Sequence, residues 1–341
     1  MRAAVIEGPG RVAVRDVPAA RAADGRALVR VSQAGICGTD LKIAAGDVPV
    51  VAPVVLGHEM TGRVEIPGRG GALGPGTAVL LNPSPFCGRC DRCRRDLPHL
   101  CRHGRLLGRD ADGCFAEYIA ADEALLHPIP DSVTRDEGAL LQVLSTCIHA
   151  QSAIRAWPED VAVVIGLGVA GLLHLQLLRE RGVRSIIAVT RSAAKHELAR
   201  RFGASAVVGP DEADEAVADA TAGRSADIVV ECAGSAATLA QAFRLAGAGA
   251  QVMLFGIITG IADTRPYEWY YKELTIKSPR AARPRDYDSA IALCAQRRLD
   301  LAPLVTGRFP LSRLAEALVA CADPGQLKVV LDIDAGTASA G

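Results

Sequence analysis

The sequence lacks the features that would mark a membrane or nucleic-acid-binding protein. Its 38 basic residues balance 38 acidic ones, so its net charge does not favour binding to nucleic acid or to an anionic membrane. The longest apolar runs, such as Val161–Leu167, are much too short to span a bilayer. The N-terminal segment Met1–Arg11 has neither the apolar stretch nor the cleavage pattern of a signal peptide. We therefore expect a cytoplasmic protein without nucleic-acid or membrane partners.

Aromatic residues are also scarce, at 4% of the 341 residues, although half of the chain is hydrophobic. A chain of this composition can bury a sizeable core. Because single cores stop growing at roughly 250–300 residues, the length predicts two domains. The shortage of aromatic side chains argues against a pocket for a bulky apolar ligand and favours a polar one.

Short strands separated by glycine and proline predict an all-β, barrel-like domain in residues 1–146. The expected strands include Ala3–Ile6, Ala27–Ser32, Met60–Glu65 and Thr77–Leu81, with a loop at Pro67–Gly76. Residues 282–341 are too few for a core of their own and should pack back onto this domain. They are expected to form helices at Tyr287–Arg297 and Leu311–Cys321 and a strand at Lys328–Asp332. The final segment 335–341, AGTASAG, is expected to be disordered.

Strands alternate with helices in residues 147–281, which is typical of an α/β domain with a doubly wound parallel sheet, the Rossmann arrangement. The expected strands are Val161–Ile165, Ser185–Thr190, Ala206–Val208, Asp227–Glu231, Gln251–Phe255 and Leu274–Ser278. The clearest helices are Val169–Arg181 and Ala193–Phe202.

A glycine-rich turn joins the first of these strands to its helix. Gly166, Gly168 and Gly171 fit G-x-G-x-x-G, and Val169 and Ala170 open the helix. The glycines allow a tight turn, a close approach of a pyrophosphate and close helix–strand packing. The helix N-terminus offers free N–H groups to phosphates. The strand–turn–helix context favours a dinucleotide site over a ligand-free turn.

The end of the second strand bears on the choice of cofactor. An NAD-binding domain usually carries an acidic residue there for the ribose hydroxyls. This chain has Thr190, Arg191 and Ser192, with Lys195 nearby and no acid. Because a guanidinium suits a 2′-phosphate, we favour NADP(H), with NAD(H) as the alternative if Arg191 is only a solvated surface residue.

Four of the ten cysteines lie within a short segment, which indicates a metal site rather than disulfides in a reducing compartment. Cys87, Cys90, Cys93 and Cys101 have spacings that suit a closed tetrahedral structural zinc in a lobe at about residues 84–104. An iron–sulfur cluster is the main rival, because some ferredoxins use a similar run of cysteines. The single cluster and the dinucleotide motif favour zinc.

Two motifs upstream carry candidate ligands for a second, catalytic zinc. Gly35-Ile-Cys-Gly-Thr-Asp40 and Gly57-His-Glu59 supply a thiolate, an imidazole and a carboxylate, which suit an open zinc site. By spacing alone the two motifs are weak, because an isolated cysteine or histidine is more often a core residue.

The order of these motifs resembles the zinc-dependent medium-chain dehydrogenase/reductase family, in the alcohol dehydrogenase superfamily and its threonine, sorbitol and glucose dehydrogenase branch. The resemblance implies a GroES-like catalytic domain formed by residues 1–146 and 282–341. It implies that Cys37 and His58 bind the catalytic zinc, and that Glu59 is a ligand or exchanges with one. Thr39 would pass on the substrate proton, and Asp40 would orient the histidine.

The chain departs from its relatives at Gln142 and Lys42. Relatives often have Cys, Asp or Glu as a further zinc ligand where this chain has Gln142. Its carbonyl oxygen either coordinates the zinc or bonds the zinc-bound water. Lys42 replaces a histidine of the proton relay. A lysine relays protons only with a lowered pKa, so Lys42 otherwise lies near the cofactor or in solvent.

The resemblance implies a homodimeric or homotetrameric enzyme with two zinc ions per chain. Its reaction would transfer hydride between NAD(P) and a secondary alcohol or ketone of a polyol, sugar, cyclitol or aminocyclitol, in a biosynthetic or catabolic direction. We expect the substrate to bind between the two domains. The alternatives are a threonine-dehydrogenase-like enzyme, an aldose 1-dehydrogenase, a zinc-free reductase and a non-catalytic zinc- and dinucleotide-binding protein.

Overall fold

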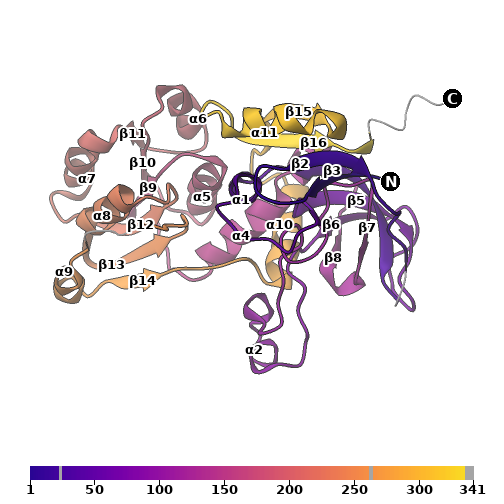
Figure 1. Ribbon diagram of the computed structural model, residues 1–341. Helices are drawn as coiled ribbons and strands as arrows, with labels where there is room; N and C mark the ends of the chain where they lie inside the picture. The colour runs from indigo at the N-terminus through magenta and orange to yellow at the C-terminus, as the bar shows by residue number, and fades with distance from the viewer. Residues whose placement is uncertain (23–24, 261–263, 335–341) are drawn as a thin grey trace. The chain divides into compact units, whose positions relative to one another are not determined.

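The computed structural model describes residues 1–22, 25–260 and 264–334, and the chain divides into two units (Figure 1). Unit 1 contains Met1–Ser145, Ala282–Arg297 and the chain from Leu301 onward. Unit 2 contains Thr146–Ala281 and Arg298–Asp300. The prediction of disorder for residues 335–341 lies outside the described residues. Among the described residues, no helix is both long and apolar enough to cross a bilayer.

Unit 2 is built on a parallel six-stranded sheet with the order β11-β10-β9-β12-β13-β14. Its strands are β9 (Val161–Ile165), β10 (Ser185–Val189), β11 (Ala206–Val208), β12 (Ala226–Glu231), β13 (Ala246–Leu254) and β14 (Thr275–Lys277). The helices are α4 (Leu141–Gln151, which begins in unit 1), α5 (Val169–Glu180), α6 (His196–Arg201), α7 (Ala213–Thr221), α8 (Ala236–Leu245) and α9 (Pro266–Tyr271). All five residues of β9 are buried, as expected of a central strand covered by helices on both faces.

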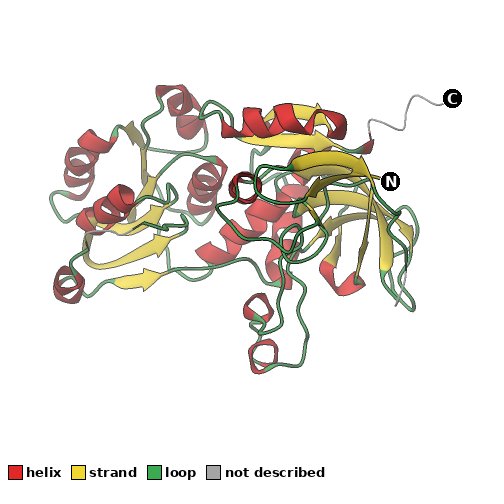
Figure 2. Cartoon of the chain, in the orientation of Figure 1, coloured by secondary structure: helices red, strands yellow, loops and turns green. Residues whose placement is uncertain are grey.

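Unit 1 contains a seven-stranded sheet, in which β15-β16-β3-β5-β6-β8 follow one another and β7 also pairs with β3, and a three-stranded sheet with the order β2-β1-β4 (Figure 2). The strands are β1 (Arg2–Ile6), β2 (Val12–Asp16), β3 (Ala27–Gly35), β4 (Val54–Val55), β5 (Glu59–Ile66), β6 (Ala78–Leu81), β7 (Tyr118–Ala121), β8 (Leu126–Pro128), β15 (Val305–Pro310) and β16 (Lys328–Asp332). The helices are α1 (Gly38–Ala45), α2 (Asp91–Arg94), α3 (Arg135–Gly138), α10 (Pro284–Ala295) and α11 (Leu314–Ala322).

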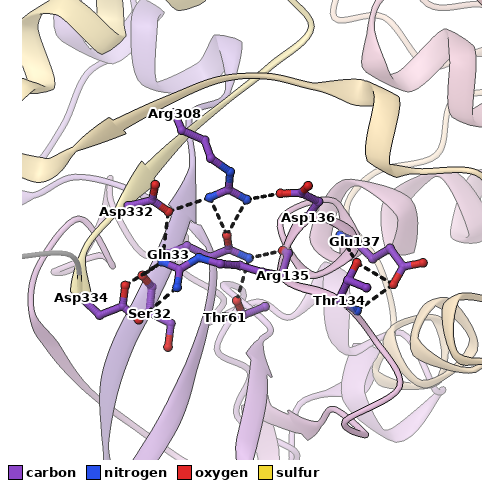
Figure 3. A network of polar contacts seen from close by, with 10 residues as sticks. All are labelled: Ser32, Gln33, Thr61, Thr134, Arg135, Asp136, Glu137, Arg308, Asp332 and Asp334. Atoms are coloured by element: carbon purple, nitrogen blue, oxygen red, sulfur yellow. Dashed lines mark hydrogen bonds and ion pairs between the residues drawn. The ribbon is translucent and has the colours of Figure 1, made fainter.

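The C-terminal part of the chain joins the sheet of unit 1. Strand β16 pairs antiparallel with β3, with Val330 opposite Gly35. A polar network reinforces this pairing (Figure 3). Arg308 contacts Asp332 at 2.6 Å and also Asp136, while Arg135 reaches Asp332 at 3.0 Å. The network therefore ties α3 to β15 and β16, which lie much later in the sequence.

The predicted fold class, a doubly wound parallel sheet together with a β-rich domain, is confirmed. Strands β9, β11 and β16 begin and end where the sequence predicted. The all-β description of residues 1–146 is wrong in detail, because α1, α2 and α3 lie there and α4 begins there. Helix α1 forms because Cys37 and Asp40 make a capping box, a polar start that an apolar pattern does not reveal.

Two predicted helices were too long at their N-terminal ends. Each begins with a short 3-10 turn, η3 (Ala193–Lys195) before α6 and η6 (Leu311–Arg313) before α11. Strand β15 was not predicted. Its residues Val305-Thr-Gly-Arg-Phe-Pro310 lack a clear alternation of polar and apolar side chains, and the strand is specified by pairing with β16.

Candidate functional site

The first motif of the candidate catalytic site lies where β3 ends and α1 begins. Cys37 is the N-cap of α1, and its backbone N–H donates to Oδ2 of Asp40 at 2.9 Å. Asp40 is fully buried, whereas Thr39 is half-buried and Lys42 is exposed. The capping contact therefore holds the backbone of Cys37 and leaves Oδ1 of Asp40 available for a second partner.

The second motif lies at the start of β5. Gly57 has a φ of +92°, and a Cβ on this residue would lie 2.1 Å from the ring of Phe115, so only glycine fits. The two residues that follow, His58 and Glu59, are both buried. Strand β5 pairs antiparallel with β3, with Glu59 opposite Gly35. This register brings the second motif beside the first.

The two motifs together offer three possible ligand atoms to a metal, one each from Cys37, His58 and Glu59. These three atoms all lie within 4.8 Å of one another. Nδ1 of His58 lies 3.2 Å from Oδ1 of Asp40, and neither of these buried atoms has another partner among the described residues. Nε2 of His58 lies 4.0 Å from Oε1 of Glu59. A thiolate, an imidazole and a carboxylate gathered in this way fit a zinc ion with an open coordination position.

Electrostatics around His58 supports this fit. Burial lowers the pKa of His58, but the charge and hydrogen bond of Asp40, with a contribution from Cys37, outweigh burial and raise the pKa well above its usual value. The imidazole therefore lies where positive charge is favoured, and a metal cation bound at Nε2 satisfies the same field.

A residue that the sequence analysis missed also touches this group. Nζ of Lys328, at the start of β16, lies 2.6 Å from Oε2 of Glu59. Burial lowers the pKa of Lys328, but the charges of Glu59 and Cys37 outweigh burial and raise it, so the ammonium form is present. A lysine in the otherwise apolar stretch of β16 was the signal that could have identified it.

Gln142 is buried on α4, and its side chain lies close enough to Tyr287 on α10 to act on the pKa of the Tyr287 hydroxyl, which it lowers. Burial raises the pKa of Tyr287, so its hydroxyl stays protonated. The ring of Tyr287 stacks on His127 with centroids 4.9 Å apart, and Nδ1 of His127 lies 2.7 Å from Asp288. Gln142 therefore lies near a buried tyrosine that no sequence motif indicated.

The four cysteines of the predicted lobe come together around α2 and η1 (Pro98–Leu100). The Sγ atoms of Cys90 and Cys93 are 3.5 Å apart, those of Cys87 and Cys101 also 3.5 Å, and those of Cys90 and Cys101 3.8 Å. Zn–S bonds of roughly 2.3 Å in a tetrahedron require sulfurs about 3.8 Å apart. The spacing therefore fits a closed zinc site.

The protonation of these thiols also favours a cation. Backbone N–H groups of Cys93 and Arg102 lower the pKa of Cys90 to about 6. Burial and the neighbouring sulfurs raise the pKa of Cys93 to about 12. Thiolates this close repel one another unless a divalent cation lies among them, and such a cation allows all of them to ionise.

In unit 2 the glycine-rich turn has the geometry of a dinucleotide site. Gly166 has a φ of +91°, and a Cβ on Gly171 would lie 1.9 Å from the carbonyl oxygen of Gly166, so both positions require glycine. A Cβ on Gly168 would meet nothing within 4 Å. Gly168 is the N-cap of α5, which Val169 and Ala170 begin. The turn therefore leaves open space where a pyrophosphate would approach the helix N-terminus.

The residues predicted to select the cofactor follow β10, the neighbour of β9 in the sheet. Thr190 is buried, and its Oγ1 accepts a hydrogen bond from the backbone N–H of Ser192 at 3.2 Å. Arg191 is exposed, and burial lowers the pKa of half-buried Lys195. These residues present hydroxyl, guanidinium and amine groups but no carboxylate.

Comparison with known proteins gives the family. Residues 23–131 match the alcohol dehydrogenase GroES-like domain, and residues 169–296 match the zinc-binding dehydrogenase model. A sorbitol dehydrogenase from Halalkalibacterium halodurans is 29% identical over 330 residues, with 95% of this chain and 96% of the relative covered. An L-threonine 3-dehydrogenase from Anaeromyxobacter sp. (strain K) is 30% identical over 329 residues, with 93% and 94% covered.

Among solved structures, a protein from Sinorhizobium meliloti 1021 described as a zinc-binding dehydrogenase and bound to NADP has 32% sequence identity and a TM-score of 0.90. The match covers 97% of this chain and 99% of that one. The chain therefore belongs to the zinc-containing alcohol dehydrogenase family of medium-chain dehydrogenases/reductases. The predicted class of enzyme, a zinc-dependent oxidoreductase that uses a nicotinamide cofactor, is confirmed.

Proposed function

We propose that the chain transfers hydride between NADP(H) and a secondary alcohol or ketone of a polar substrate, with Cys37 and His58 as the protein's principal ligands to a catalytic zinc. Unit 1 is the proposed catalytic domain and unit 2 the proposed dinucleotide-binding domain. The group formed by Cys37, His58 and Glu59, whose ligand atoms lie within 4.8 Å of one another, is the observation that carries this proposal.

The residues around the metal site have separate proposed roles. A bound zinc supplies Lewis-acid stabilisation of the substrate oxygen. Asp40 holds the ring of His58 through the 3.2 Å contact at Nδ1, so that Nε2 faces the metal. The hydroxyl of Thr39 accepts the substrate proton and passes it to solvent, whereas Lys42, one turn further along α1, is exposed.

Gln142 is the proposed further contact to the metal or its bound water. Because Gln142 lowers the pKa of Tyr287, its amide N–H group is the part directed toward that hydroxyl, which leaves the carbonyl oxygen to act in this way. Such an oxygen adds no charge, so the metal would be a stronger Lewis acid than with a carboxylate in that position.

The cofactor preference rests on the end of β10. Arg191 is exposed and its guanidinium suits a 2′-phosphate, with Ser192 and Lys195 nearby and no competing acid. The Sinorhizobium meliloti relative was solved with NADP bound. NADP(H) is therefore the proposed cofactor, held at Gly166, Gly168 and Gly171.

A polyol, sugar or cyclitol is the proposed substrate class. The sorbitol and threonine dehydrogenase relatives are named for small polar substrates. Aromatic residues, which would line a pocket for a bulky apolar alcohol, make up only 4% of the chain. Secondary alcohols, polyols, aldoses, aminocyclitols and threonine, each assayed with NAD and NADP, would identify the substrate by nicotinamide absorbance.

The Cys37→Ser variant tests the proposed metal site. We expect it to lose one of two zinc ions per chain and essentially all turnover, while NADP binding measured by calorimetry stays unchanged. Cys294→Ala, a change of a buried cysteine elsewhere in unit 1, is the control and should keep both zinc ions. Full turnover in Cys37→Ser at a demonstrated loss of the second zinc would contradict the proposal.

We also propose that the chain forms a homodimer or homotetramer. Tyr267, Tyr270 and Tyr271 are 65–79% exposed on the six-residue helix α9, although the chain has only five tyrosines. Close by in sequence, β14 is an edge strand with one unpaired side. Exposed aromatic groups of this kind are enriched at protein interfaces. Light scattering would test the assembly, and a monomeric protein with full activity would contradict it.

We also propose that the protein is located in the cytoplasm. All ten cysteines lie in the part of the chain that the structure describes, none of them forms a disulfide, and five belong to neither proposed metal site. Thiolate zinc sites persist most readily in a reducing compartment. Cell fractionation with an antibody to the chain would test this location.

A further inference from the structure

Lys328 forms a buried ion pair with Glu59. The side chains of the two residues are only 5% and 3% exposed, and Nζ of Lys328 lies 2.6 Å from Oε2 of Glu59. The ammonium group also donates to the backbone carbonyl of Ile36 at 3.3 Å. Removing a lysine and a carboxylate from water costs several kcal/mol for each ion, so the pair is not expected where strand packing is the only requirement.

The fold makes room for this pair at one residue of the neighbouring strand. A Cβ on Gly35 would lie 2.9 Å from Oε2 of Glu59 and 3.3 Å from Nζ of Lys328. Gly35 stands opposite Glu59 in the β3–β5 pairing and opposite Val330 in the β3–β16 pairing. The central strand therefore has no side chain at the point where strands on either side contribute the two charges.

The two oxygens of Glu59 have different surroundings. Oε2 is bound by Lys328, whereas Oε1 lies 4.0 Å from Nε2 of His58, on the side of the candidate metal site. We propose that Lys328 is a positioning residue that anchors Glu59 by Oε2, so that only Oε1 can reach the catalytic metal and the metal is held less tightly. This inference rests on the proposed metal site.

Two physical consequences follow from the anchored carboxylate. A carboxylate held by an ammonium group cannot chelate zinc with both oxygens, which leaves a coordination position for substrate or water. The positive charge of Lys328 also repels a metal cation, and this repulsion is strong because the interior has a low dielectric constant. The same charge offsets the negative charge of Glu59, which would otherwise attract the metal. Removing the ammonium group should therefore strengthen zinc binding rather than weaken it.

The Lys328→Met variant tests the proposal through zinc release to a chromophoric chelator, which does not require turnover. Wild-type protein should release two zinc ions in two phases, one for each site. In Lys328→Met we expect release from the catalytic site to slow at least tenfold, with release from the cysteine lobe unchanged. The absorption of cobalt substituted at the catalytic site should weaken, as expected when an added oxygen raises the coordination number.

Two further variants separate positioning from a structural role. Lys328→Arg keeps the charge and should release zinc within about threefold of the wild-type rate. In a Glu59→Gln background, Lys328→Met should change release by less than about threefold, because the carboxylate that it frees is absent. This double variant buries no unpaired charge, so it also serves if Lys328→Met folds poorly.

Three results would contradict a positioning role for Lys328 or the metal site on which it depends. Unchanged or faster zinc release in Lys328→Met, with an equal fall in Tm for the metal-free and zinc-loaded protein, would show that the ion pair only supports the fold. An equal slowing of release in the Glu59→Gln background would also overturn the inference. If the wild-type chain binds zinc only at the cysteine lobe, the proposed function fails at its metal site, whatever the role of Lys328.

Discussion

The two candidate metal sites of unit 1 are assembled in opposite ways. The cysteine lobe takes all four sulfurs from residues 87–101, around one turn of helix and a 3-10 turn. The catalytic group takes Cys37 from the end of β3, His58 and Glu59 from the start of β5, and Lys328 from β16. The first site is a property of a short segment, whereas the second exists only after three strands have paired.

This difference explains why the two sites suit different roles. A lobe whose ligands are all thiolates has no open position, and its metal serves to hold a segment that has no buried residue in α2. The group at β3 and β5 mixes ligand types and is oriented by buried neighbours, Asp40 and Lys328. Such neighbours adjust a metal that must exchange ligands during a reaction.

The largest expected effect comes from Cys93→Ser, which breaks the local site. Because structural zinc supplies folding free energy, we expect the lobe to lose its zinc and to unfold locally. Metal analysis should give one zinc per chain, and trypsin should cut at the arginines of residues 89–105.

Cys321→Ser, a change of a half-buried cysteine outside the lobe, is the control for this variant and should keep both zinc ions. A Cys93→Ser protein that retains two zinc ions and resists trypsin would show that the lobe is not held by metal.

A smaller effect is expected from Asp40→Asn, which weakens the assembled site without removing a ligand. The amide keeps the size of the side chain but loses the charge that holds Nδ1 of His58. Loss of such an orienting carboxylate typically costs 10–100-fold in metal affinity or activity. We expect a loss of this size in zinc affinity by chelator competition, with the lobe zinc unaffected as an internal reference.

The matched control for Asp40→Asn is Asp47→Asn on the exposed turn after α1, which should leave zinc affinity unchanged. Equal zinc affinity for Asp40→Asn and Asp47→Asn would remove Asp40 from the site.

The smallest effect is expected from Arg191→Ala in unit 2. In that unit the glycine-rich turn follows β9, whereas Arg191, the proposed specificity residue, follows the neighbouring strand β10. Loss of one charge-assisted contact of about 1.5–3 kcal/mol should weaken NADP binding by roughly 10–100-fold. NAD binding should change by less than about threefold. Calorimetric titration of both cofactors measures this ratio, and an equal loss for NAD and NADP would contradict the assigned role.

Short-range patterns were enough to predict much of the molecule. Strands β9, β11 and β16, the turn at Gly166–Gly171 and the four-cysteine lobe were all found from spacing, because each is specified by residues close together in the chain. The division of residues into a β-rich part and a doubly wound part followed from the change in hydrophobic period near residue 147.

Contacts between residues far apart in the sequence could not be predicted from local patterns. Strand β15 has no clear alternation and exists because β16 lies beside it. Lys328 looked like the polar end of an apolar strand, although its ammonium is buried against Glu59. Tyr287 gave no motif, yet it contacts Gln142 from a helix that begins more than 100 residues later in the chain.

The amino-acid sequence by itself determined which ligand chemistries this protein carries, because thiolates, an imidazole and glycine turns are recognisable from residue type and spacing. Only the tertiary structure decided which charged groups pair with each other. Strand pairing brings Nζ of Lys328 to 2.6 Å from Oε2 of Glu59, although the two residues are 269 positions apart in the sequence. The physical reason is burial: an unpaired charge in a low-dielectric interior has a high free-energy cost. Each buried ion therefore requires the strand that supplies its partner.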